Sequence, residues 1–210
     1  MDPQADLPDQ EMLRRYASTR SQEAFARIVE RHAPMVVQTA LRVMGNRQDA
    51  EDVSQAVFLI LSQRAGSVTH TLSGWLHKVT RDVALQSLRS RARRTRREEA
   101  AVRSKSTPDA AKEMEWHKEL DQAVVKLPDR LREAVVLRYL EGRSQEEAAQ
   151  MVACDKATLS RRCTQGLTRL AALLSSGGVA VAPSLLAGYL TSQAPVSVSA
   201  ATLATLQAIG

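Results

Sequence analysis

Apolar side chains recur every three or four residues along most of the chain, which is the spacing of helices that bury one face. Residues 9–45 are predicted to form two helices, with a start signal at Ser21 and a further apolar run that opens at Pro34 and ends at Gly45. Proline first and glycine last is the usual asymmetry of a helix. His32 falls on the apolar face, so we expect a packed side chain there rather than a ligand.

A further helix is predicted to open near Asn46. Its inner face carries Val53, Ala56, Val57, Ile60 and Leu61. Residues 66–74 are predicted to form a loop, because glycine and small polar residues interrupt the pattern. The helical period then returns at Leu76, Val79 and Val83, in a helix that runs into a series of arginines.

Residues 98–115 lose the apolar period and contain the serine, threonine and proline typical of a flexible connection. We place the domain boundary there. The helical pattern resumes at Leu120, breaks at Pro128 and continues to a turn at Glu141 and Gly142.

The segment after this turn has the pattern of a helix-turn-helix. Ser144 and Glu147 form a capping box, which predicts a short helix that ends near Val152. Asp155 can cap a second helix. The inner face of that helix carries Leu159, Cys163, Gly166 and Leu170.

These patterns predict an all-α protein with two small helical domains joined by a flexible linker. The first domain is placed at residues 1–97, the linker at 98–115 and the second domain, which contains the helix-turn-helix, at 116–174. Aromatic residues make up only 3% of the chain and alternating β-branched patterns are scarce, so no substantial sheet is expected.

The tail, residues 175–210, follows Arg169 without a single charged residue. Its apolar stretches are interrupted by prolines and fall short of the roughly eighteen residues that span a bilayer. We interpret it as a weakly ordered or amphipathic appendage, in preference to a packed helical pair or a membrane-proximal segment. Such an appendage could fold back as a transient cover over a DNA-binding face, whereas membrane contact has no support in the sequence.

Composition excludes several classes of function. The two cysteines, Cys154 and Cys163, form no metal-ligand pattern, and we expect small core residues, no metal and no cofactor. No nucleophile with a base and no phosphate-binding glycine loop is found, so an enzyme with a small-molecule substrate is not expected. The N-terminus lacks the features of a signal peptide, which predicts a cytoplasmic protein.

Positive charge is concentrated in one segment. The net charge is +6, but residues 61–105 alone carry 11 basic and 3 acidic side chains. Such an excess suggests a polyanion as partner, with a solvated charged linker as the alternative. Its core is a helix end that carries Lys78, Arg81, Arg89, Arg91, Arg93, Arg94, Arg96 and Arg97. Phosphate contacts would relieve the mutual repulsion of these side chains.

Carboxylates open the helix that follows Asn46. Asp49, Glu51 and Asp52 would each offset the positive helix N-terminus by about 0.3–1 kcal/mol, so helix capping alone could account for them. Capping does not explain the exposed Gln55 on the same side. We therefore favour a protein-docking surface.

The second helix of the helix-turn-helix presents hydrogen-bond donors on its outer face. A helical wheel directs Thr158, Arg161 and Gln165 outward. The flanks carry Lys156, Ser160 and Arg162. These side chains suit base edges and phosphates in the major groove of DNA.

The order and spacing of these features over residues 10 to about 173 resemble a sigma-70 family RNA polymerase sigma factor of the small extracytoplasmic-function (ECF) type. The similarity rests on the segments 49–53, 75–79, 127–128 and 141–144. The uncharged tail resembles the Ala/Leu-rich C-terminal extensions of planctomycete-type members.

The resemblance implies a partner and a role for each surface. The segment at Asp49 to Asp52 would dock on the coiled-coil clamp of the large subunit of core RNA polymerase. The loop at 64–73 would hold a base flipped out of the minus-ten promoter element, with Thr69 and His70 as lining residues. The second domain would bind the minus-thirty-five element, and an anti-sigma factor is a further candidate partner.

The chain departs from the family pattern at three places. Asp82 stands where an asparagine is common, and Gln86 where an acidic residue is common. A carboxylate only accepts hydrogen bonds, so Asp82 could select a cytosine amino group but would repel phosphate. The turn at Ala153 lacks the family's glycine, which is costly if its φ is positive.

Two other functions remain open on the sequence. A stand-alone repressor could use the helix-turn-helix and oligomerise through its first half, and would bind DNA tightly without polymerase. An RNA-binding protein could use the arginines but has no use for the acidic helix.

Trp75 is expected in the core, with base stacking as the alternative.

Overall fold

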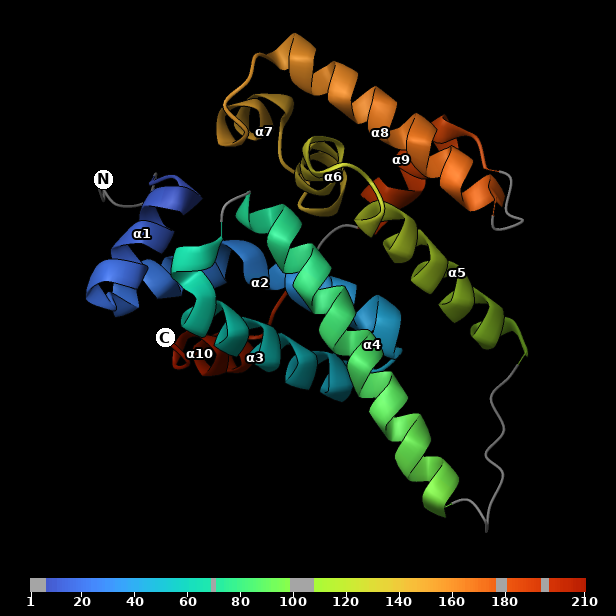
Figure 1. The fold of residues 1–210 in the computed structure, drawn as a ribbon, viewed down its shortest axis with the longest axis horizontal. Coiled ribbons are helices and arrows are strands. Elements are labelled where there is room, and N and C mark those ends of the chain that lie inside the picture. Colours follow the sequence, from blue (N-terminus) through green and yellow to red (C-terminus); the bar gives the residue numbers. More distant parts are fainter. Residues whose placement is uncertain (1–6, 69–70, 99–107, 177–180, 194–196) are drawn as a thin grey trace.

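The structure, a computed structural model, describes residues 7–68, 71–98, 108–176, 181–193 and 197–210, and every regular element in them is helical (Figure 1). The all-α class is thus confirmed. The elements are α1 (Asp9–Thr19), α2 (Gln22–Met44), α3 (Arg47–Arg64), the 3-10 turn η1 (Ala65–Ser67), α4 (Leu72–Glu98), α5 (Pro108–Val125), α6 (Asp129–Val135), the π-helical turn η2 (Val136–Leu140), α7 (Gln145–Met151), α8 (Lys156–Ser176), α9 (Pro183–Ser192) and α10 (Ala200–Gln207).

The first module, helices α1 to α4, is bounded by the predicted local signals. The Ser21 hydroxyl accepts from the backbone N–H of Ala24 at the start of α2, and Gly45 ends that helix with a φ of 75°. Asn46 caps α3 through the N–H of Asp49 at 2.9 Å. These caps satisfy backbone groups that a helix end leaves unpaired, so the three boundaries could be found from local sequence.

Pro34 does not begin a helix, and that prediction is wrong. It lies inside α2, which continues from Gln22 to Met44. Proline inside a helix costs about 3 kcal/mol because it removes a hydrogen bond and crowds the preceding turn. Burial of apolar side chains on both sides of it, such as Val29 and Val36, opposes this cost.

The predicted loop at 66–74 is shorter in the structure, because α4 already begins at Leu72. Leu72 is buried, and Gly74 lies inside the helix and close to α6. A Cβ at Gly74 would stand 3.3 Å from the side chain of Glu133. The glycine therefore serves the approach of two helices rather than a loop.

The prediction of a flexible connection over 98–115 is wrong at its ends. Helix α4 continues to Glu98, and α5 begins at Pro108, while residues 99–107 lie outside the described residues. Proline is favoured in the first turn of a helix, and the alanine, lysine and glutamate that follow are strong helix formers. The segments at both ends of 98–115 form helices although they carry no apolar period, because residues with high helix propensity do not need one.

The second module, helices α5 to α8 with η2, contains the predicted helix-turn-helix. The reciprocal capping box of Ser144 and Glu147 is present at α7, and Asp155 accepts from the backbone N–H of Thr158 at 2.7 Å in α8. Ala153 occupies the turn with a φ of 50°. Gly166 lets α8 approach α6 closely.

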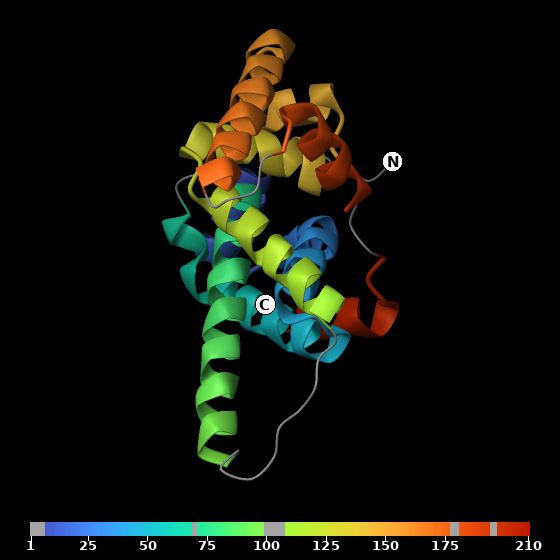
Figure 2. The same ribbon diagram turned by 90° about the vertical axis from the view of Figure 1, so that its right-hand side faces the viewer.

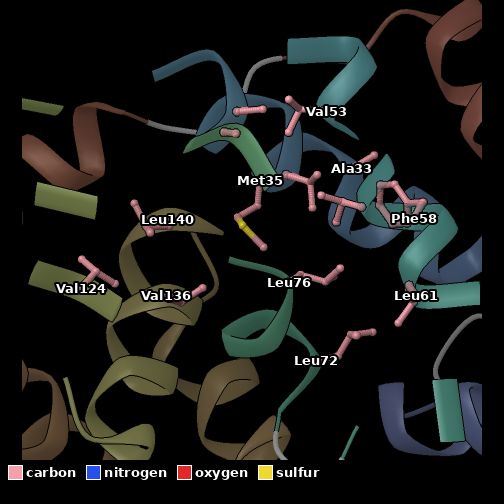
Figure 3. Packing of buried hydrophobic residues seen from close by; sticks show 14 of the residues in the cluster. Ala33, Met35, Val53, Phe58, Leu61, Leu72, Leu76, Val124, Val136 and Leu140 are labelled. Atoms are coloured by element: carbon pink, nitrogen blue, oxygen red, sulfur yellow. The ribbon is translucent and has the colours of Figure 1, made fainter. Parts of the chain in front are cut away.

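The two modules share one apolar core (Figure 3). Met35 of α2 and Leu76 of α4 belong to the same buried cluster as Val124 of α5 and Val136 and Leu140 of η2. A smaller second cluster, which includes Leu159 and Cys163, lies under the helix-turn-helix. Both cysteines are free, and burial raises the pKa of the Cys163 thiol, as expected for a small core residue.

The tail forms two packed helices, so the predicted weakly ordered appendage is wrong. Helix α9 lies on α8 and η2, and α10 lies on α2 and α3 (Figures 1 and 2). Leu186, Leu190 and Leu206 are fully buried in these contacts. These three leucines of the tail therefore face the two modules. Within the described residues no helix is long and apolar enough to cross a membrane.

Candidate polymerase-docking and DNA-binding surfaces

Helix α3 presents an exposed stripe along one side. The stripe, which we call the docking stripe, consists of Gln48, Asp52, Gln55, Leu59 and Gln63. Asp52 makes no hydrogen bond or ion pair with a residue that the structure describes, so its carboxylate is available to a partner. Asp52 and Gln55 thus lie as the helical pattern predicted.

Asp49 and Glu51 lie on the two edges of this stripe and are already engaged. Asp49 is ion-paired with Arg91 of α4. Glu51 accepts from Arg47 at 3.0 Å and from the Thr202 hydroxyl of α10 at 3.1 Å. A partner that contacts either carboxylate must therefore replace an intramolecular contact.

Leu59 is a residue of this surface that the sequence analysis missed. Its side chain is 49% exposed, which makes it one of two large exposed apolar residues among those described. It follows Gln55 by one helical turn on the polar side of α3. An apolar residue at a position of the polar face was the signal that could have found it, because exposed apolar groups often mark contact sites.

Helix α4 carries the basic surface, and its C-terminal half projects away from the rest of the molecule (Figure 1). Lys78, Arg89 and Arg93 are exposed, while Arg81 is largely covered. Thr69 and His70 lie outside the described residues, as does the side chain of Arg94. Trp75 is half-buried and packs against the apolar core, which favours the core interpretation.

A hollow of about 770 Å³ lies on this basic surface. It is lined by Arg81, Asp82, Leu85, Gln86, Arg89, Arg93 and Gln122. Asp82 is exposed and stands 3.6 Å from Arg81. The structure therefore places the unusual carboxylate among arginines, where it lowers the local positive charge.

Helix α8 presents its predicted outer face without cover from the tail helices. Ser160, Arg161 and Gln165 are exposed, and Arg162 is half-buried. Lys156 pairs with Glu146 at 3.0 Å, and the Thr158 hydroxyl donates to Asp155 at 2.7 Å. Thr158 is therefore partly committed to the helix cap, and Arg161 and Gln165 are the best-placed groups for base edges.

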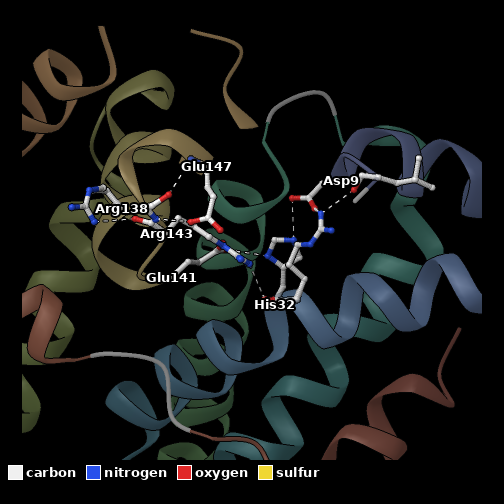
Figure 4. Close-up of polar contacts among 9 residues, drawn as sticks. Asp9, His32, Arg138, Glu141, Arg143 and Glu147 are labelled. Atoms are coloured by element: carbon white, nitrogen blue, oxygen red, sulfur yellow. Dashed lines mark hydrogen bonds and ion pairs between the residues drawn. The ribbon is translucent and has the colours of Figure 1, made fainter. Parts of the chain in front are cut away.

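A buried ionic cluster joins the modules at His32 (Figure 4). Its Nε2 lies 3.1 Å from Asp9 of α1, and its Nδ1 lies 3.0 Å from Glu141 of the second module. Burial alone lowers the pKa of His32, but the two carboxylates outweigh it and raise that pKa to about 9. Burial likewise opposes the effect of His32 and Arg31 on Asp9, whose pKa is nevertheless lowered to about 2.

A second buried cluster lies on Asp121 of α5. Arg42 of α2 donates to both carboxylate oxygens, at 2.9 and 3.1 Å, and the Nε2 of His77 lies 3.1 Å from one of them. Burial opposes the ionised form, but Arg42 and His77 hold the pKa of Asp121 well below its usual range. Sequence analysis missed both clusters because their members lie far apart in the chain.

Comparison with known families matches both modules. The model of Sigma-70 region 2 matches residues 28–94, and that of Sigma-70 region 4 matches residues 117–170. The matched segments contain α3 with its docking stripe, the basic part of α4 up to Arg94, and the helix-turn-helix.

Several curated sigma factors are similar in sequence. The ECF RNA polymerase sigma factor SigE of Mycolicibacterium smegmatis is 31% identical over 158 residues, which cover 68% of this chain and 58% of SigE. EcfG of Rhodopseudomonas palustris is 30% identical, with 66% of this chain and 78% of EcfG covered. CarQ of Myxococcus xanthus is 30% identical, with 73% of this chain and 91% of CarQ covered.

Among solved structures, CnrH in complex with the cytosolic domain of CnrY covers 80% of this chain and 97% of that chain at 23% identity. Its TM-score of 0.37 is too low for a comparison of domain placement. The two family models together match more than half of the chain, and EcfG and CarQ are each 30% identical to it. The chain therefore belongs to the sigma-70 family, as a sigma factor of the ECF type, that is, a promoter-specificity subunit of RNA polymerase.

Proposed function

We propose that this sigma factor docks on core RNA polymerase through the docking stripe of α3, contacts the minus-ten region through α4 and reads the minus-thirty-five element through α8. In this role it recruits the polymerase to promoters and assists duplex opening, in the cytoplasm where bacterial polymerase works. The observation that carries the proposal is the exposed, unpaired Asp52 on a stripe that also presents Gln55 and Leu59.

The chemistry of the docking stripe fits a protein partner better than DNA. The Asp52 carboxylate would be repelled by phosphate, whereas a protein surface can supply a basic group for Asp52 and an apolar patch for Leu59 on the same stripe. The basic residues that we assign to DNA lie on α4 and α8 instead. The three surfaces therefore separate polymerase docking from DNA contact.

The basic side chains of α4 and of α8 are arranged differently. On α4 the arginines stand close together around the hollow at Asp82, which suits backbone phosphates. On α8 the exposed Arg161 stands one helical turn from Gln165, and both can donate to base edges in the major groove. We therefore assign general DNA affinity chiefly to α4 and sequence selection chiefly to α8.

The docking assignment is tested by Asp52→Arg and by Leu59→Arg, with Glu23→Arg as the control. Glu23 is exposed in the first turn of α2 and is not part of the docking stripe. Affinity for core polymerase, measured by fluorescence anisotropy, should fall at least about tenfold for the first two variants and stay unchanged for the control. Exposed substitutions seldom unfold a domain, and circular dichroism should show this.

Equal affinity of all three variants would overturn the docking assignment. A stand-alone repressor gives a further contrast, because it would bind promoter DNA tightly without polymerase. A sigma factor should bind its promoter weakly until core enzyme is added. Transcription by the reconstituted holoenzyme on a promoter library would then identify the elements read by α4 and α8.

A further inference from the structure

The two tail helices connect the modules from outside. Leu186 and Leu190 of α9 are buried against the second module, and Leu206 of α10 is buried against the first. Residues 197–199 lead directly into α10, whose first turn is capped by the Ser199 hydroxyl. The tail therefore contacts both modules, one with each helix.

Helix α10 lies along one edge of the docking stripe. Its Thr202 hydroxyl donates to Glu51 at 3.1 Å, and Glu51 precedes the unpaired Asp52 directly. The Gln22 side chain of α2 also donates to the carbonyl of Gly210. The α2 and α3 surface next to the docking stripe is thus occupied by this chain's own residues.

We infer that α10 and core RNA polymerase compete for this edge of α3, so that the tail is a built-in competitor of polymerase binding. The inference rests on the proposed docking stripe. A partner that contacts Asp52 and Gln55 must pass within reach of Glu51, whose carboxylate is already shared by Arg47 and Thr202. Binding of the tail to the first module therefore weakens binding of polymerase, and binding of polymerase weakens that of the tail.

The uncharged composition of the tail fits a reversible contact. Helix α10 presents no ionic group to α3, and its contact consists of buried leucine and one hydroxyl hydrogen bond. A short helix of this kind is held mainly by packing, so its detachment costs little compared with unfolding of a module. The apparent affinity for polymerase is then reduced in proportion to the fraction of molecules with α10 bound.

The test compares Leu206→Asp with Leu185→Asp. Leu206 of α10 is fully buried, whereas Leu185 of α9 is 67% exposed. Leu185→Asp therefore serves as the control, because it makes the same change in the same tail. Leu206→Asp, and likewise a chain that ends at Ser199, should bind core polymerase at least about fivefold more tightly than the unmodified protein. Leu185→Asp should bind as the unmodified protein does. Unchanged or weaker binding by both the Leu206 variant and the shortened chain would overturn the inference.

A measurement on the unmodified protein removes any dependence on how the variants fold. Amide hydrogen exchange in residues 200–207 should become faster when core polymerase is added, because bound polymerase displaces α10. Protection that stays the same or increases would refute the competition.

Asp52→Arg, introduced into the Leu206→Asp protein, separates this inference from the proposed function. If it abolishes the tighter binding, the gain arises at the docking stripe. If Asp52→Arg lowers core affinity while removal of α10 leaves that affinity unchanged, docking stands and the competition fails. If Asp52→Arg has no effect in either background, the docking assignment itself fails, and with it the competition.

Discussion

The buried His32 should make the stability of this protein pH-dependent. The pKa of His32 is raised from 6.5 to about 9 in the fold, because Asp9 and Glu141 outweigh the opposing effect of burial. The folded protein therefore holds a proton that the unfolded chain releases between these two values. A raised pKa contributes stability that is fully present below pH 6.5 and is lost as the pH rises through about 9.

The size of this contribution follows from the two pKa values. Their difference corresponds to about 3 kcal/mol of unfolding free energy at low pH, of which about 2 kcal/mol should remain at pH 7.5 and almost none at pH 10. This is a large share of the stability of a domain of this size. Because Glu141 belongs to the second module, the same proton also strengthens the contact between the modules.

His32→Gln is the variant that isolates this effect, since glutamine can donate a hydrogen bond but does not titrate. Urea unfolding of both proteins, followed by circular dichroism from pH 6.5 to 9.5, gives the difference between their free energies of unfolding. That difference should shrink by about 2 to 3 kcal/mol across the range. Cysteine and tyrosine titration is common to both proteins and cancels. A difference that stays constant from pH 6.5 to 9.5 would refute the proposed protonation of His32.

Four further substitutions test the second module and the basic helix. Ala153→Gly should stabilise the protein by about 0.5–1 kcal/mol in urea unfolding, because the φ of 50° disfavours a side chain with a Cβ. Gly166→Ala should destabilise it by about 1–3 kcal/mol, since the new Cβ would lie 2.6 Å from Val135 Cγ2. Arg161→Ala should reduce discrimination within the minus-thirty-five element by about 1–3 kcal/mol in holoenzyme binding, whereas Arg93→Ala should weaken binding to all promoters and flatten its salt dependence. If Arg161→Ala instead weakens holoenzyme binding equally at all promoters, Arg161 contacts phosphate and reads no base.

Helix ends and the faces of single helices could be predicted because their causes are local. The capping box at Ser144 and Glu147 acts within one turn, and Gly45 ends α2 through its own backbone. The exposed side of α3 follows from helical spacing alone. The end of α4 at Glu98 could not be found this way, because the arginine-rich segment that precedes it carries no apolar period.

Contacts between distant segments could not be predicted. Asp49 and Arg91 were assigned to polymerase and DNA respectively, yet the structure pairs them with each other. Their positions are 42 residues apart, and charge patterning specifies no partner at that range. The packing of α10 was missed for the same reason, since the tail's uncharged composition fits an apolar appendage as well as a packed helix.

The contact between the modules contains buried charge, and this bears on how easily the modules separate. Arg42 of the first module is ion-paired with Asp121 of the second, and both side chains are buried. Removal of ions from water costs several kcal/mol each, and their attraction repays this cost only in part, so apolar side chains of similar volume would hold the modules at least as firmly. When the modules part, however, the same ions regain their hydration, whereas an apolar contact would expose its surface at a full cost. The two ionic clusters therefore specify how the modules fit together more than they hold them, and the apolar core that the modules share supplies most of the cost of separating them.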